Sequence, residues 1–249
     1  MKIKRILIVA GSIFLVIAIC LIAFEIKEYI DYEEYVFVDK VYSTIELGKS
    51  NYTINNDSNF GYFYNNGKVT IDDISDDILI EVTLKKLSKY KENDFRISKY
   101  NLNKEIYKIF NKRVYAFPKT AINNFLCSEN GNYYECYKGD EGDCAASGYV
   151  KDKLDWTKDE DKLIIYERAY YYEGLLDEDD TKYFNLTVYD NDLSKNILLT
   201  KKGLVDGFNP YITDDAIYKN SNLIYKWTYK KINGKYYFQS VERDDSYEF

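Results

Sequence analysis

The sequence predicts an α+β protein, with an N-terminal transmembrane helix followed by an antiparallel, aromatic-rich sheet packed against two helices. Three observations lead to this prediction. An apolar stretch near the N-terminus is long enough to cross a bilayer. Two later stretches repeat apolar residues with the period of a helix. Much of the remaining chain alternates aromatic or β-branched residues with polar ones between turn signals.

The predicted membrane anchor runs from Ile6 to Phe24, a stretch of 19 residues that spans ~28 Å as a helix. Basic residues precede the stretch and acidic residues follow it, so the positive-inside rule places the N-terminus in the cytoplasm. The expected organisation is a cytoplasmic tip (1–5), a transmembrane helix (6–24), a juxtamembrane linker (25–33) and an extracytoplasmic α+β domain (34–249).

Two other interpretations of this segment remain open. A cleaved signal peptide has a shorter apolar core and a site with small residues at two positions, which the end of the stretch at Phe24 lacks. A lipid anchor on Cys20 is disfavoured because Ile19 is larger than the residue that usually precedes a lipidated cysteine. We favour the uncleaved anchor, and all three interpretations export the rest of the chain.

The first part of the exported chain is expected to form two strands and then two helices. The strands are Glu34–Leu47 and Tyr52–Ile54, which are rich in β-forming residues. The first helix begins at Ser75, whose hydroxyl can cap it, and ends near Lys89. The second helix begins near Asn101 and closes at Lys112 and Arg113, with an apolar stripe of Leu102, Ile106, Ile109 and Phe110.

The later chain is expected to consist mainly of strands. Asn130-Gly131 is typical of a tight hairpin turn. The segment 137–162 is glycine-containing and highly charged, which suggests a long loop or an internal boundary. The expected strands are Val114–Phe117, Ile122–Cys127, Tyr133–Tyr137, Leu163–Tyr172 and Lys182–Tyr189, with a solvated acidic turn at Asp177–Asp180.

The strongest local signal is the closing hairpin around Asn233-Gly234, a pair that favours a two-residue turn with positive φ. Pairing about this turn sets Tyr229 opposite Phe238, Lys231 opposite Tyr236 and Trp227 opposite Ser240. Five aromatic residues then share one face, which we expect to be the core face: Tyr225, Trp227, Tyr229, Tyr236 and Phe238.

Two stretches carry a resemblance to known proteins. The segment 71–79, with the sequence IDDISDDIL, and the closing hairpin 225–242 resemble uncharacterised single-pass membrane-anchored proteins of low-GC gut Firmicutes and mollicute-like bacteria. The resemblance implies a surface-anchored protein and brings no activity with it. The closing hairpin also resembles the last strands of nuclear-transport-factor-like and cystatin-like domains, although the strands expected before the first helix depart from those folds.

The composition limits the chemistry. The chain has no histidine, which removes Ser-His-Asp and Cys-His catalysis and every histidine metal ligand. Exported cysteines can form disulfides, and a hairpin turn would bring Cys127 and Cys136 close together. This is the preferred pairing and leaves Cys144 as a free thiol. A Cys136–Cys144 bridge is the second choice, and a three-cysteine zinc site is disfavoured because no short paired spacing supports it.

Other ligand and catalytic motifs are incomplete. The loops 140–143 and 190–194 hold several acidic or amide oxygens, but a solvated turn explains each better than a calcium site. With 41 acidic residues, some carboxylate pair will always be spaced for glycoside hydrolysis, so the count identifies none. We assign no catalytic residue, metal ligand or cofactor. The formal net charge of −7 makes nucleic acid an unfavourable partner.

The sequence thus favours a non-enzymatic cell-surface protein that binds an unknown protein or envelope component through an aromatic-rich domain. One alternative is an accessory subunit of an envelope complex that acts through its membrane helix, where Gly11-Ser12 permits close packing. Another is a cell-wall hydrolase or a small-ligand-binding domain.

Overall fold

A computed structural model of the chain forms two compact units, Met1–Ser43 and Thr44–Phe249. The structure describes residues 2–45, 62–64, 67–89, 94–117, 127–137, 146–176, 183–189, 197–204 and 215–248. Within these ranges, some side chains are not described, including all of those before residue 17.

The first unit is a single helix, α1 (Lys2–Tyr42). The strand predicted for Glu34–Leu47 is therefore wrong from Glu34 to Tyr42, which belong to α1. The predicted linker 25–33 is also helical. No glycine or proline interrupts residues 12–47, so nothing in the backbone stops a helix there despite the β-forming side chains. Within the described part of the chain, no helix combines the length and apolarity needed to cross a bilayer. The side chain of Ile6, the predicted start of the anchor, lies outside that part.

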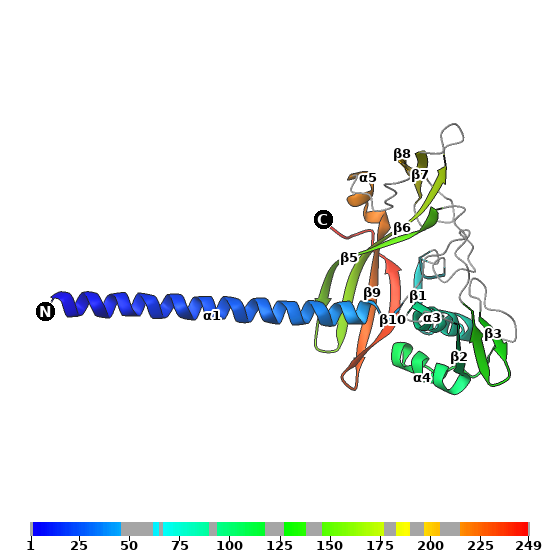
Figure 1. The fold of residues 1–249 in the computed structure, drawn as a ribbon, viewed down its shortest axis with the longest axis horizontal. Coiled ribbons are helices and arrows are strands. Elements are labelled where there is room, and N and C mark those ends of the chain that lie inside the picture. Colours follow the sequence, from blue (N-terminus) through cyan, green and yellow to red (C-terminus); the bar gives the residue numbers. More distant parts are fainter. Residues whose placement is uncertain are drawn as a thin grey trace. The chain divides into compact units, whose positions relative to one another are not determined.

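The second unit contains the antiparallel sheet that the sequence predicts, together with a few short helices (Figure 1). Its strand order is β1-β10-β9-β6-β7-β8, and β5 pairs with the other edge of β6. The strands are β1 (Lys68–Thr70), β5 (Ala146–Lys158), β6 (Lys162–Leu176), β7 (Tyr183–Tyr189), β8 (Ile197–Leu204), β9 (Ile224–Ile232) and β10 (Lys235–Arg243).

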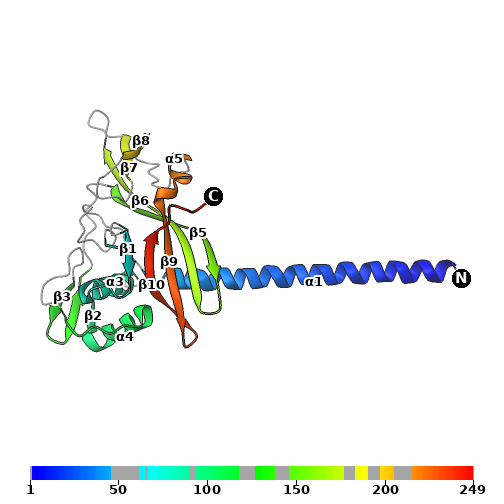
Figure 2. The same cartoon turned by 180° about the vertical axis from the view of Figure 1, so that it is seen from behind.

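Two helices and a smaller sheet lie beside β1 and β10 in both views (Figures 1 and 2). The apolar stripe of α4 packs on the large sheet, where the rings of Phe110 and Phe238 lie 6.1 Å apart. The elements are α3 (Asp76–Lys89), α4 (Lys99–Phe110) and the strands β2 (Phe95–Ser98), β3 (Cys127–Asn130) and β4 (Tyr133–Cys136) in the order β2-β4-β3. Short helices α5 (Asp215–Tyr218) and η2 (Ser221–Leu223) precede β9.

Several element predictions need correction. Strand β5 occupies much of the segment 137–162, which was expected to be a long loop or an internal boundary. Its backbone pairs with β6, while several of its charged side chains stay exposed. Residues Val114–Phe117 are not a strand. Strands β1, β2 and β8 were not predicted. The expected strand Tyr52–Ile54 and the acidic turn 177–180 lie outside the described residues.

The closing hairpin confirms the turn but only part of the predicted register. Asn233 and Gly234 have φ of 50° and 79°, and Phe238 pairs with Tyr229 as expected. A bulge between Phe238 and Ser240 then shifts the pairing, so that Trp227 faces Val241 instead of Ser240. The bulge lets two β10 side chains three residues apart both reach the core.

Four of the five predicted core aromatics on this hairpin are buried: Tyr225, Trp227, Tyr229 and Phe238. Tyr236 is only half-buried, while its neighbour Tyr237 is buried and lies 6.4 Å from the ring of Tyr107. The core-face prediction is therefore confirmed except at Tyr236. The next residue, Tyr237, is buried instead and contacts Tyr107 of α4.

Strand β6 joins two cores within the second unit. Its first half pairs with β9 and its second half with β7, along the same edge. The second half contributes to a separate cluster that includes residues from β5, β7, α5 and η2: Val150, Tyr170, Tyr172, Leu186, Val188, Ile217 and Leu223. Because β6 is covered on both faces where the two halves meet, adjacent side chains at 167–172 are all buried.

One charged side chain, Glu167 of β6, is buried among aromatic residues of β9 and of the segment before β1. Glu167 is 0 % exposed, yet it sits on the core face of β6. The Tyr64 hydroxyl and the Trp227 Nε1 both donate to Glu167 Oε1, the latter at 3.1 Å. Lys151 Nζ lies 3.5 Å from Oε2, and the Tyr225 hydroxyl donates to the Tyr64 carbonyl at 3.3 Å. A buried carboxylate is tolerated because three separate segments supply its partners.

Replacing Tyr64 with Phe removes one donor from this buried carboxylate without changing the ring. We expect Tyr64→Phe to lower the free energy of unfolding by about 1–3 kcal/mol, because Glu167 keeps its desolvation cost and loses a bond. Urea unfolding of the full chain in detergent measures the change. The matched control is Tyr115→Phe, since Tyr115 is 86 % exposed and its change should stay within about 0.5 kcal/mol. Equal stability of the two variants would contradict this role of Tyr64.

Candidate functional site

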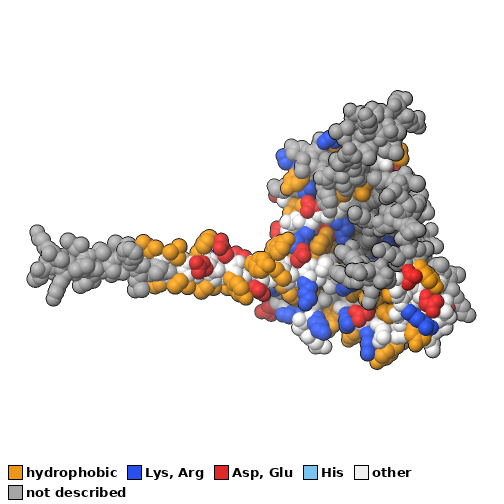
Figure 3. All heavy atoms as spheres, in the orientation of Figure 1, with side chains coloured by type: hydrophobic (Ala, Val, Ile, Leu, Met, Phe, Trp, Pro, Cys, Tyr) orange, Lys and Arg blue, Asp and Glu red, His pale blue; other side chains and the backbone are white. Residues whose placement is uncertain are grey.

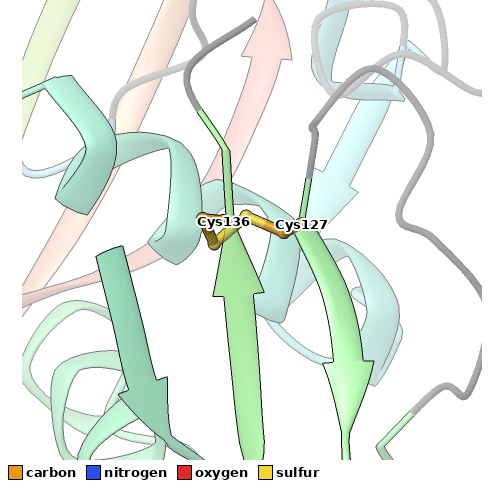
Figure 4. The surroundings of a disulfide bond; sticks show 2 residues. All are labelled: Cys127 and Cys136. Carbon is orange, nitrogen blue, oxygen red and sulfur yellow. A yellow bond between two sulfur atoms is a disulfide. The ribbon is translucent and has the colours of Figure 1, made fainter. Parts of the chain in front are cut away.

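The predicted disulfide is present and anchors the small sheet beside α4. Cys127 and Cys136 form the bridge and face each other directly across β3 and β4 (Figure 4). The turn falls at Gly131-Asn132, one residue later than predicted, which is the shift that brings the two cysteines opposite each other. Gly131 takes a φ of 59°, a conformation that glycine adopts without strain.

Helix α4 has a buried face and an exposed face. Ser98 caps its first turn by accepting a bond from the Asn101 N–H at 3.2 Å, and Asn111 ends it with a φ of 53°. The predicted stripe Leu102, Ile106, Ile109 and Phe110 is buried. A second stripe with the same spacing lies on the opposite side of the helix and is exposed: Tyr100, Lys104, Tyr107 and Lys108.

The chain folds back beside this exposed stripe after α4 ends. Asn103 clamps the returning segment through both of its amide atoms, with Oδ1 accepting from the Val114 N–H and Nδ2 donating to the Val114 carbonyl, each at 2.7 Å. Asp76 of α3 accepts from the backbone N–H of Tyr115 at 3.2 Å and of Ala116 at 3.1 Å. These bonds fix Arg113 and Phe117 as a second wall facing α4.

The helix and the returning segment enclose an open groove with a volume of about 410 Å³. We call it the α4 groove, and its lining residues are Lys99, Tyr100, Asn103, Lys104, Tyr107, Lys108, Arg113 and Phe117. Four of these residues are basic and three are aromatic, and none is acidic. Figure 3 shows basic and hydrophobic side chains side by side over α4.

The basic side chains of the groove are held in two different ways. Lys99 and Lys108 are ion-paired, with Glu129 and Glu105 respectively, each at 2.6 Å. Lys104 and Arg113 instead lie over tyrosine rings, 4.3 Å from the Tyr100 centroid and 5.6 Å from that of Tyr107. Such contacts orient a cation without neutralising its charge. The groove is therefore a positively charged concavity in an acidic protein.

Other predicted site residues lie elsewhere or outside the described part. Cys20 is a free, exposed cysteine of α1. Cys144 lies outside the described residues, as do the two loops weighed as calcium sites. Among the side chains that are described, no three acidic or cysteine residues are placed to hold a metal ion together. Glu167 has both oxygens engaged and is closed to solvent, so it cannot contact a substrate.

A second buried acidic group lies in α3. Glu81 is 4 % exposed, and burial raises its pKa from an ordinary 4.5 to about 7. Lys85 Nζ, at 4.0 Å from Glu81 Oε1, opposes this shift, and the negative charge of Asp77 adds to it. The pair faces the interior of the second unit, so Glu81 affects stability rather than a surface site.

The comparisons with known proteins add no relative. No family model, no curated protein and no solved structure matches the chain.

The α4 groove was not predicted from the sequence, although the pattern of residues that forms its helical wall is visible there. The exposed stripe that starts at Tyr100 has the same helical period as the buried stripe, offset by two residues. The other wall could not be found in this way. Arg113 and Phe117 reach the groove only because Asn103 and Asp76 turn the chain back.

The raised pKa of Glu81 predicts a pH-dependent stability. A folded-state pKa above the unfolded value means that the folded protein binds the extra proton, so this stabilisation is complete below about pH 4.5 and is lost as the pH rises to about 7. We expect Glu81→Gln to remove that decline. Between about pH 4.5 and 7, the free energy of unfolding of the wild type should fall by on the order of 3 kcal/mol more than that of the variant. Urea unfolding at several pH values measures it.

The control for this experiment is Glu160→Gln, an exposed acidic residue between β5 and β6. It should leave the slope of stability against pH unchanged. A Glu81→Gln protein that keeps the wild-type slope would show that the buried carboxyl does not titrate in this range.

Proposed function

We propose that the protein is a membrane-anchored, non-enzymatic binding domain that recognises an anionic partner outside the cytoplasm through the α4 groove. The observation that carries the proposal is the clustering of four basic and three aromatic side chains in one concavity without an acidic one. A cationic concavity attracts and concentrates anionic groups.

The construction of the groove supports binding rather than turnover. Its walls are a capped helix and a segment held by Asn103 and Asp76, so the side chains that meet a ligand are already positioned. The lining contains cations, rings and one amide that is already engaged by Val114. The lining holds neither a carboxylate nor a thiol, two of the side-chain types that commonly act as base or nucleophile.

Membrane anchoring is supported by the sequence of the N-terminal segment. Residues 6–24 are almost entirely apolar and follow three basic residues, while acidic residues begin at Glu25. The backbone of α1 is helical through this stretch and on to Tyr42, another 18 residues or ~27 Å. In this proposal, residues 6–24 anchor the chain in the bilayer and the binding domain lies on the extracytoplasmic side.

The accessory-subunit hypothesis has an observation of its own. The second half of α1 exposes large apolar side chains among its acidic ones, including Ile26, Tyr29, Ile30 and Phe37. Exposed apolar side chains on a helix can pack against another membrane-proximal helix. In this alternative, the protein binds its partner through α1, and the C-terminal unit does not take part in binding.

The anchoring proposal predicts that the full chain stays in the membrane fraction after carbonate extraction. A protease added to intact cells from which the wall has been removed should degrade the C-terminal unit, because that unit faces outward. Deleting residues 2–24 should release the protein from membranes. Extraction of the full chain by carbonate, or protection of its C-terminus from the protease, would contradict the proposed topology.

The binding proposal predicts that the full chain in detergent binds labelled polyglutamate, and that binding weakens as salt rises from 50 to 500 mM. The double variant Lys104→Gln, Arg113→Gln should bind about tenfold more weakly, because it removes the two cations that have no carboxylate partner among the described residues. Fluorescence anisotropy measures the affinity.

The matched control removes the same amount of charge elsewhere. Lys230→Gln and Lys235→Gln lie on the exposed end of the β9–β10 hairpin and should leave the affinity within about twofold of wild type. Equal losses in the two double variants would mean that net charge, and not the α4 groove, governs binding.

A further inference from the structure

We infer that the ligand of the α4 groove is an anionic polysaccharide, whose sugar rings pack on Tyr100 and Tyr107 and whose acid groups meet Lys104 and Arg113. The inference rests on the proposed binding function and goes further by naming the ligand class. It follows from the charge, the spacing and the exposure of these four side chains.

The charge available to a ligand comes from two of the four basic residues. Lys99 and Lys108 each have a carboxylate partner at 2.6 Å, so a ligand gains little from them. Lys104 and Arg113 have only ring contacts, and no ion pair involves either of them within the described part of the chain. The ligand therefore carries at least two acid groups, of which the guanidinium of Arg113 can bind one in bidentate fashion.

The spacing indicates an extended ligand. Each of the two cations is paired with a tyrosine, giving one unit at Tyr100 and Lys104 and a second at Tyr107 and Arg113. The two tyrosines are seven residues apart on α4, which places them ~10.5 Å apart along the helix axis. A single inorganic phosphate or small carboxylic acid cannot reach both units. A polymer with repeated acid groups can.

The exposed tyrosine rings indicate that the ligand also has apolar surface. Tyr100 is 69 % exposed and Tyr107 is 42 % exposed, although each already contacts its own cation. An amphipathic ring with an exposed surface suits a ligand that presents apolar C–H faces together with hydroxyl groups. Sugar rings have both, and an acidic sugar adds the charge, so one class of compound matches all of the groove's features.

Other polyanions match the groove less well. Polyglutamate has the charge but no ring faces to pack on tyrosine. Single-stranded nucleic acid could stack its bases on the rings and place phosphates on the cations, so oligo(dT) is included as a competitor in the test. A bilayer surface is flat and cannot enter a concavity of about 410 Å³.

The test compares three labelled polymers on the full chain in detergent: polygalacturonate, polyglutamate of matched length and charge, and oligo(dT). We expect polygalacturonate to bind at least tenfold more tightly than either of the others at the same salt concentration. Neutral dextran should not bind measurably, because it lacks the acid groups that Lys104 and Arg113 require.

The tyrosine contribution is tested with Tyr100→Ala, which should weaken polygalacturonate binding about fivefold and weaken polyglutamate binding by a smaller factor, because the ring also orients Lys104. Tyr115→Ala is the matched control, since Tyr115 is 86 % exposed and does not line the groove. A circular dichroism melt of each variant verifies that the fold is kept.

The outcomes separate the two proposals. If polyglutamate and polygalacturonate bind equally well, or if Tyr100→Ala and Tyr115→Ala behave alike, the sugar inference is wrong and the anion-binding function stands. Tighter binding of oligo(dT) would overturn the inference in favour of nucleic acid. If no anionic polymer binds, both the inference and the proposed function fail.

Discussion

The second unit is organised around a carboxylate that has no access to water. Glu167 occupies a core-facing position of β6, between apolar neighbours on the same face, where an unpaired charge would cost several kcal/mol. Its partners Tyr64, Lys151 and Trp227 come from a segment before β1, from β5 and from β9. These partners together offset the cost of burying the charge. A slip of β6 by one residue would carry Glu167 to the opposite face, so the carboxylate also specifies the register.

The same scaffold holds α4 at the edge of the sheet. Its buried stripe packs on β10, and this leaves the opposite stripe in solvent. The returning segment is then fixed by Asn103 and Asp76, and the hairpin bridged by Cys127 and Cys136 supports the far end of the groove through the Lys99–Glu129 ion pair. A surface that binds through positioned cations needs this rigidity, because ordering flexible lysine and arginine side chains on binding would cost affinity.

The predictions that succeeded depend on short-range chemistry. The turn at Asn233-Gly234 forms because both residues tolerate positive φ, and α3 and α4 follow from apolar spacing and capping residues. The predictions that failed depend on partners distant in the chain. The bulge after Phe238 is set by the need to bury Val241 against Trp227, and β5 is a strand because β6 offers it an edge. The β-forming residues after Glu34 continue α1 because no breaker separates them from it.

By itself, the sequence determined the α+β class, the closing turn and the exclusion of histidine chemistry, and it favoured the pairing of Cys127 with Cys136 over the alternative with Cys144. Each of these follows from residue identity or from neighbours a few positions away. Only the tertiary structure decided that Glu167 is buried, that Tyr236 is not a core residue, and that Arg113 and Phe117 face α4 to form a groove. The reason is physical: burial and charge environment are properties of contacts between distant segments, and those contacts exist only once the chain has folded.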